Sequence, residues 1–248
     1  MKKIFLTSAL GIYSYVNEKR IPSKIINTNN MIGLLRSLIS SRNRLILIAG
    51  NPDDYGKNNE ICDLTKKSFE MSELKFEEVI LIDRRNDINI DNLIKDADLI
   101  ILSGGHLPSQ NKWFKEMKLE NILKSYNGII IGQSAGSMNC AEVVYSCPEL
   151  EGEAVNPEFN RWREGLGLTN INVFPHFNEF ISVELDGFRM IEDIVLKDSF
   201  KNIIYALNDG SFIEIAEDKN IAYGECFQIF NGSITKICEN GQTQDINS

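Results

Sequence analysis

The sequence predicts an α/β protein, a three-layer α/β/α sandwich whose sheet is mostly parallel and carries an antiparallel extension at its C-terminal end. Two observations support this fold class. In the first half of the chain, short apolar runs alternate with longer segments of helical spacing, which is typical of βαβ units. Because these runs are apolar throughout, helices are expected to cover both faces of the sheet. In the last third, closely spaced short runs replace the alternation.

The parallel part of the sheet is predicted from apolar runs rich in β-branched residues. They span residues 3–8, 44–49, 78–82, 98–102 and 128–132. Apolar residues at i, i+3, i+4 and i+7 predict helices between them, at residues 31–39, 55–71 and 113–123. The order strand, helix, strand therefore recurs along this part of the chain.

The pattern changes after residue 176. One helix is predicted at 183–196, and short strands follow at 202–207, 211–216, 221–225, 227–230 and 233–238. Asn208-Asp209-Gly210 and Asn231-Gly232 are typical of hairpin turns. These strands are expected to extend the same sheet in antiparallel fashion. No linker rich in Pro, Gly or Ser interrupts the chain, so residues 1–248 are interpreted as a single domain.

Composition excludes several classes of partner. The net charge of −9 argues against a nucleic-acid partner, because binding to a phosphate backbone needs clustered Lys and Arg. The apolar segment 2–10 is short and soon followed by polar residues, so it is interpreted as a first strand. No apolar run approaches the roughly 18 residues that span a membrane. We therefore expect no membrane partner, while the sequence leaves a homodimer open.

Cysteine usage bears on compartment and cofactors. The chain has five cysteines, an odd number without CxxC spacing. This pattern favours reduced thiols in the cytoplasm over a disulfide framework or a zinc site. No cluster of metal-ligating residues is evident in the sequence either. We therefore expect a cytoplasmic protein without a metal or an organic cofactor.

The most informative motif is Gly132-Gln133-Ser134-Ala135-Gly136. It follows an apolar strand and precedes a helical segment, the context in which Gly-x-Ser-x-Gly forms a nucleophile elbow. The serine hydroxyl then projects from the end of the sheet, and backbone N–H groups at the start of the helix can bind an oxyanion. The pattern also occurs in ordinary loops, but its strand–helix context favours Ser134 as a nucleophile.

The chain has only two histidines, so few candidates exist for a histidine base. His176 ends an apolar stretch just after Pro175, where a strand runs out into a loop, and such ends collect catalytic groups in open α/β sheets. A serine nucleophile needs a nearby base, which favours His176 over a purely structural role. His106 stays an alternative base, although Gly104-Gly105 before it indicate a backbone that approaches a ligand closely.

The segment 147–167 is irregular and rich in charge. A loop of this length in a compact domain is usually functional. It lies between Ser134 and His176 in sequence, so we expect it to cross the mouth of the active site.

Three segments resemble the motif blocks of the serine peptidases related to dipeptidase E and cyanophycinase. They are residues 101–105 (Ile-Leu-Ser-Gly-Gly), 132–137 (Gly-Gln-Ser-Ala-Gly-Ser) and 174–177 (Phe-Pro-His-Phe). Their order and spacing match, and they cover roughly the central third of the chain. The resemblance implies a fold similar to class I glutamine amidotransferases, with serine in place of their elbow cysteine.

The resemblance also implies a triad in the order serine, acid, histidine. Ser134 and His176 carry over directly. The acid of the family lies about fifteen positions after the serine, where this chain has Glu149, with Glu151 and Glu153 as competitors. A glutamate suffices chemically, because the acid only orients the imidazole and stabilises its charged form.

The same resemblance suggests the remaining site residues. Gly105 and Ala135 would supply the N–H groups of the oxyanion hole. Gly104 and His106 would contact substrate, although the residues after Gly105 depart from the dipeptidase pattern. A preference for Asp-Xaa dipeptides would require a cation, for which Arg189 is the first candidate, and Arg161 and Arg163 are alternatives.

The sequence therefore predicts a serine peptidase that hydrolyses small peptides, with Asp-Xaa dipeptides as one substrate class. A cyanophycinase-like hydrolase is an alternative, because acidic residues of segment 147–167 would suit an aspartate–arginine polymer. A further alternative keeps the fold but lacks catalysis, as a module that binds a small amino-acid-like ligand. An amidotransferase-like partner subunit is disfavoured by serine at the elbow.

Overall fold

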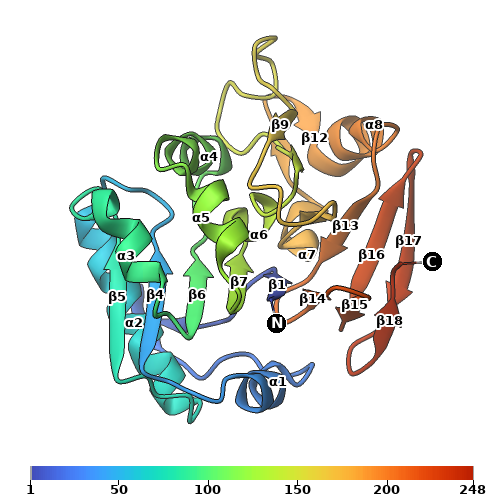
Figure 1. The fold of residues 1–248 in the computed structure, drawn as a ribbon. Coiled ribbons are helices and arrows are strands. Elements are labelled where there is room, and N and C mark those ends of the chain that lie inside the picture. Colours follow the sequence, from blue (N-terminus) through green and yellow to red (C-terminus); the bar gives the residue numbers. More distant parts are fainter. Residues whose placement is uncertain (1, 248) are drawn as a thin grey trace.

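The computed structural model describes residues 2–247 and has the α/β architecture that the sequence predicts. Its main sheet contains eight strands in the order β18-β15-β14-β1-β7-β6-β4-β5 (Figure 1). The parallel part consists of β1 (Lys3–Thr7), β7 (Ile129–Gln133), β6 (Leu99–Leu102), β4 (Arg44–Ile48) and β5 (Glu78–Ile82). The antiparallel part consists of β14 (Phe212–Ile215), β15 (Asn220–Tyr223) and β18 (Thr243–Asp245).

Helices cover both faces of this sheet, as continuous apolar strands require. In β1, Phe5 packs on one face while Ile4 and Leu6 pack on the other. The face of Phe5 is covered by α1 (Met31–Leu38) and α2 (Tyr55–Met71). The opposite face is covered by α3 (Ile90–Ile94), α4 (Leu107–Glu116), α5 (Leu119–Ser125) and α6 (Ala135–Met138).

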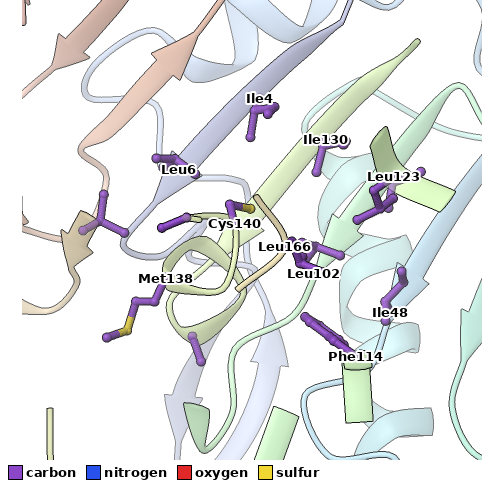
Figure 2. Packing of buried hydrophobic residues seen from close by; sticks show 14 of the residues in the cluster. Ile4, Leu6, Ile48, Leu102, Phe114, Leu123, Ile130, Met138, Cys140 and Leu166 are labelled. Atoms are coloured by element: carbon purple, nitrogen blue, oxygen red, sulfur yellow. The ribbon is translucent and has the colours of Figure 1, made fainter. Parts of the chain in front are cut away.

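Figure 2 shows the second of these two cores at close range. Ile48, Leu102 and Ile130 from neighbouring strands meet Phe114 and Leu123 from the covering helices, and all five side chains are fully buried. Burying such a side chain contributes about 1.5–3 kcal/mol. The parallel strands and their helices therefore hold the loops at the carboxyl edge of the sheet in place.

Several predicted helices need correction. The helix predicted at 113–123 is two helices, α4 and α5, because Lys118 adopts a left-handed conformation between them with φ of 53°. The prediction for 183–196 is wrong in its first part. A small hairpin of β11 (Glu184–Leu185) and β12 (Phe188–Arg189) comes first, followed by a π-helix (Met190–Val195) and α8 (Leu196–Asp198).

The C-terminal strands do not all join the main sheet, in contrast to the expectation. A second sheet has the order β10-β13-β16-β17, with the strands β10 (Asn172–Phe174), β13 (Ile204–Leu207), β16 (Cys226–Phe230) and β17 (Ser233–Cys238). Its own core includes Phe174, Ala206 and Ile229, packed against the π-helix. The stretch before His176 therefore belongs to this second sheet.

One of the two predicted hairpin turns is confirmed and the other is wrong. Asn231-Gly232 joins the paired strands β16 and β17, with positive φ at both positions as a tight hairpin requires. The segment 208–211 joins β13 to β14, which lie in different sheets and do not pair. This connection therefore crosses from the second sheet to the main sheet.

Short elements complete the description. The hairpin of β2 (Tyr13–Val16) and β3 (Lys19–Pro22) follows β1, and β8 (Val143–Tyr145) pairs with β9 (Trp162–Glu164). A 3₁₀ turn (Asp87–Asn89) precedes α3, and α7 (Phe177–Phe180) follows β10. Among residues 2–247, no helix has both the length and the apolar character needed to cross a membrane.

Candidate active site

Ser134 lies at a strained turn between β7 and α6. Its backbone has φ of 51° and ψ of −120°, a region that residues with a Cβ rarely occupy. Hydrogen bonds to the end of β1 stabilise this turn, because the Ser134 N–H donates to the carbonyl oxygens of Thr7 (3.0 Å) and Ser8 (3.1 Å). The hydroxyl is thereby presented at the carboxyl edge of the parallel strands.

The two glycines of the motif are required by close packing. A Cβ on Gly132 would lie 2.5 Å from the Cα of Ser137, and one on Gly136 would overlap the carbonyl group of Leu102. Both contacts involve backbone, which cannot move aside. Glycine at these positions therefore lets α6 start directly behind Ser134.

His176 meets Ser134 across the junction of the two sheets. It follows β10 and Pro175 in a left-handed conformation, with φ of 56°, and its N–H donates to the hydroxyl of Ser8 (2.8 Å). Its Nε2 lies 3.1 Å from the Oγ of Ser134, within hydrogen-bond reach. The pair that the sequence suggested is thus brought together.

His106, the alternative base, lies elsewhere. Its Nε2 contacts a carboxylate oxygen of Glu153 (2.9 Å), and its Nδ1 contacts the hydroxyl of Ser109 (2.8 Å). Both ring nitrogens are therefore engaged away from Ser134. Glu153 also accepts N–H groups of Glu149 and Leu150, so it ties segment 147–155 to the Gly104–His106 segment.

The carboxylate beside His176 comes from Asp209, which the sequence analysis did not select. Its Oδ1 lies 2.8 Å from the Nδ1 of His176 and accepts a hydrogen bond from the hydroxyl of Ser8 (2.7 Å). With Nδ1–H donating to Asp209, Nε2 is left to accept the Ser134 hydroxyl proton. The local sequence around Asp209 signals only a turn, and nothing in it marks this carboxylate.

Glu149 does not have the position that was predicted for it. No hydrogen bond joins its carboxylate to His176 in the part of the chain that the structure describes, and Glu151 and Glu153 make none to it either. Asp209 already occupies the Nδ1 side. Glu149 lies near His176, where desolvation of its carboxyl group and the charge of Glu153 raise its pKa, and the neighbouring His176 opposes that shift.

The Ser134–His176–Asp209 arrangement has consistent electrostatics. Burial by itself would lower the pKa of His176, but the hydrogen bond and charge of Asp209, aided by Glu179 and Glu149, outweigh it and raise the pKa. Burial would raise the pKa of Asp209, but hydrogen bonds from His176 and Ser8 outweigh it and lower the pKa. Asp209 thus stays ionised and stabilises a positively charged imidazole.

This predicts the acid limb of the pH–rate profile. A base must be neutral, so activity falls as pH drops through the pKa of His176. Because that pKa is raised, the midpoint of the kcat/KM profile is expected above the ordinary value of about 6.5. Asp209→Asn removes the charge but keeps the burial, so residual activity should show a midpoint at lower pH. A midpoint that does not move would exclude Asp209 as the cause.

The segment that contains Gly104 and Gly105 lies beside Ser134. A Cβ on Gly104 would lie 3.1 Å from the Cβ of Ser134, so this segment passes directly against the serine. Within residues 2–247, neither Gly105 nor Ala135 has an acceptor for its N–H. Gly50, at the end of β4, packs against Gly104 and Gly105 so closely that a side chain there would displace them. Gly105 and Ala135 therefore have N–H groups that are free to bind an acceptor, and the oxyanion hole stays a prediction.

A cavity of about 490 Å³ opens beside Ser134 and His176. Its other lining residues include Gly104, Gly105, Glu179 and Asp209, together with Tyr13, Tyr15 and Arg20 of the β2–β3 hairpin and Lys57 of α2. Its volume suits a short peptide.

Arg189, the first candidate for a substrate-binding cation, is not among the residues that line this cavity. It lies in the β11–β12 hairpin, with 57% of its side chain exposed, and pairs with Asp193 (3.0 Å). Arg161 and Arg163 do not line the cavity either. The helix predicted at 183–196 begins instead with the β11–β12 hairpin, which carries Arg189.

One group of side chains has metal-ligating chemistry. His176, Glu179 and Asp209 place ligand atoms within 4.8 Å of one another. Two of these three groups already form the contacts with Ser134 and Ser8 described above. A cation held there would compete with the proton that His176 must accept.

Comparisons with known proteins bear on the family and the fold of this chain. The family model described as Peptidase family S51 matches residues 31–222. The fold is similar to that of a peptidase from an acI-B1 Actinobacterium, with 15% identity, a TM-score of 0.67 and coverage of 99% of this chain and 97% of that chain. It is also similar to a putative peptidase E protein from Listeria monocytogenes EGD-e, with 16% identity, a TM-score of 0.60 and coverage of 90% and 98%. No curated protein matches this chain.

Proposed function

The chain belongs to peptidase family S51 and is a serine peptidase, and from that premise we propose that it hydrolyses small peptides with Ser134, His176 and Asp209 as its catalytic triad. One observation carries the proposal. The Oγ of Ser134, both ring nitrogens of His176 and a carboxylate oxygen of Asp209 form one hydrogen-bonded chain, with distances of 3.1 and 2.8 Å. Such a chain is the arrangement that activates a serine hydroxyl.

The proposed reaction follows from these positions. His176 takes the hydroxyl proton at Nε2 while Ser134 Oγ attacks the peptide carbonyl carbon. The N–H groups of Gly105 and Ala135 stabilise the oxyanion, and Asp209 stabilises the charged imidazole. His176 then gives the proton to the leaving amine, which leaves an acyl-enzyme. Water, deprotonated by His176, attacks the ester and releases Ser134 and the product acid.

Asp-Xaa dipeptides remain our proposed substrate class. The cations proposed to bind the aspartate are now Arg20 and Lys57 in place of Arg189. The cavity brings Arg20 and Lys57 into the vicinity of Ser134, whereas Arg189 lies outside it. An acidic side chain in a partly enclosed site needs a positive partner, because an unpaired buried carboxylate is costly. The presence of Arg20 and Lys57 on the cavity wall supports the proposal that the substrate is acidic.

A fluorophosphonate probe tests the nucleophile. Only an activated serine reacts with it, so the wild type should be labelled at Ser134 and Ser134→Ala should not. Ser125→Ala is the matched control, because Ser125 is exposed at the end of α5 and bonds only to the carbonyl of Ile122. Mass spectrometry of the labelled peptide locates the adduct. An unlabelled wild type would favour a non-catalytic binding module.

A hydrolysis screen then identifies the substrate. We expect cleavage of short peptides, with acidic residues preferred at the acyl position. Cleavage of aspartate–arginine conjugates with no action on α-dipeptides would favour a cyanophycinase-like hydrolase over the proposed dipeptidase.

A further inference from the structure

Charges are segregated within the cavity beside Ser134. The carboxylates of Glu179 and Asp209 stand near His176, on α7 and the 208–211 connection. The two cations come from different elements, Arg20 from β3 and Lys57 from the first turns of α2. No ion pair involves Lys57 among the described residues. A substrate with a negative group would find its partners on this cationic wall.

The guanidinium of Arg20 is held in place before any substrate arrives. It lies over the rings of Tyr13 (5.3 Å to the centroid) and Tyr15 (5.7 Å), which face it from the paired strand β2. Its Nη1 donates to the carboxylate of Glu60 on α2 (2.9 Å). Only 26% of the side chain is exposed. Stacking on the aromatic faces and the ion pair therefore fix its orientation.

One edge of this guanidinium is left without a partner. Its Nε is buried and has no acceptor anywhere in residues 2–247, and Glu60 engages only Nη1. A buried donor without an acceptor is unfavourable. Nη2 has no acceptor among these residues either and is not on the buried side, so a carboxylate in the cavity can accept a charge-assisted hydrogen bond from it.

Resting on the proposed function, we propose that Arg20 is a specificity-determining residue that binds a carboxylate of the peptide substrate, with Lys57 adding charge from the neighbouring helix α2. Two sources can supply this carboxylate. One is an acidic side chain at the acyl position, and the other is the C-terminal carboxylate of a short peptide. Both present the same chemistry to Arg20, and paired ligands distinguish them.

Binding to the inactive Ser134→Ala protein tests the proposal without relying on turnover. Calorimetry would compare Asp-Leu, Asn-Leu and the C-terminal amides of both. Adding Arg20→Met, which keeps an apolar chain against the two tyrosines, should weaken binding of the recognised carboxylate by about tenfold to a hundredfold. Arg20→Lys keeps the charge but loses the planar guanidinium that stacks on the two tyrosines, so it should recover binding only in part.

The set of peptides whose affinity falls shows which carboxylate Arg20 binds. A loss for both Asp peptides indicates the side chain, and a loss for both non-amidated peptides indicates the C-terminus. Arg189→Met in the same background is the control and should leave all four affinities unchanged. Equal affinities with and without Arg20→Met, equal losses on all four ligands, or no binding of any of them would overturn the proposal. Failure of fluorophosphonate labelling would instead overturn the proposed catalysis.

Discussion

Replacing Ser134 with alanine is expected to lower peptide turnover by about four to six orders of magnitude while the protein still folds. Turnover falls because the proposed acyl-enzyme can no longer form, and only oxyanion stabilisation and binding remain. Stability should be nearly unchanged, because alanine carries the same Cβ at φ of 51° and the turn is held by the Ser134 N–H. Steady-state hydrolysis and thermal unfolding of the purified variant measure the two effects.

The control for this result is Ser125→Ala, which removes an exposed hydroxyl that does not line the cavity and should behave as wild type. Turnover by Ser134→Ala within tenfold of the wild type would mean that another group is the nucleophile. Loss of folding together with turnover would leave the labelling experiment as the deciding measurement.

Replacing Asp209 with asparagine is expected to lower kcat by about four orders of magnitude. The side-chain amide can donate to Nδ1, which favours the tautomer with its proton on Nε2, and that tautomer cannot accept the proton of Ser134. The charge that raises the pKa of His176 is lost as well. Asparagine suits the turn conformation, so the fold should persist.

Glu149→Gln is the matched comparison, because it makes the same chemical change at the carboxylate that the sequence favoured. Glu149 has no hydrogen bond to His176, so its replacement should alter kcat only slightly. The kcat of both variants would be measured on one peptide. A larger loss for Glu149→Gln than for Asp209→Asn would return the acid role to Glu149.

Ser134 and His176 could be found from the sequence because the features that mark them are rare in this chain. A Gly-x-Ser-x-Gly motif between a strand and a helix occurs once, and only two histidines can serve it. The carboxylate had no such signal, because the chain has 35 aspartates and glutamates. Spacing borrowed from a resemblance selected Glu149, and the geometry places Asp209 at the imidazole instead.

The arginine shows the same limitation. Arg20 lies far from Ser134 and His176 in sequence, on a hairpin whose strands are mostly exposed and carry no apolar alternation that predicts them. Sequence proximity to His176 favoured Arg189, which pairs with Asp193 outside the cavity. Which cation reaches the cavity depends on where the β2–β3 hairpin packs against α2.

The sequence by itself determined the local structure of this protein and the two rarest groups of its site. Apolar runs specified β1, β4, β5, β6 and β7, residues 55–71 formed a helix with the predicted bounds, and Asn231-Gly232 closed its hairpin. Only the tertiary structure decided that β13 and β14 lie in different sheets. The 208–211 connection therefore crosses between the sheets, and this crossing places Asp209 beside His176. The physical reason is that strand propensity and turn chemistry act over a few neighbouring residues. The choice of a pairing partner depends on the burial of surfaces contributed by distant segments, and no local pattern contains it.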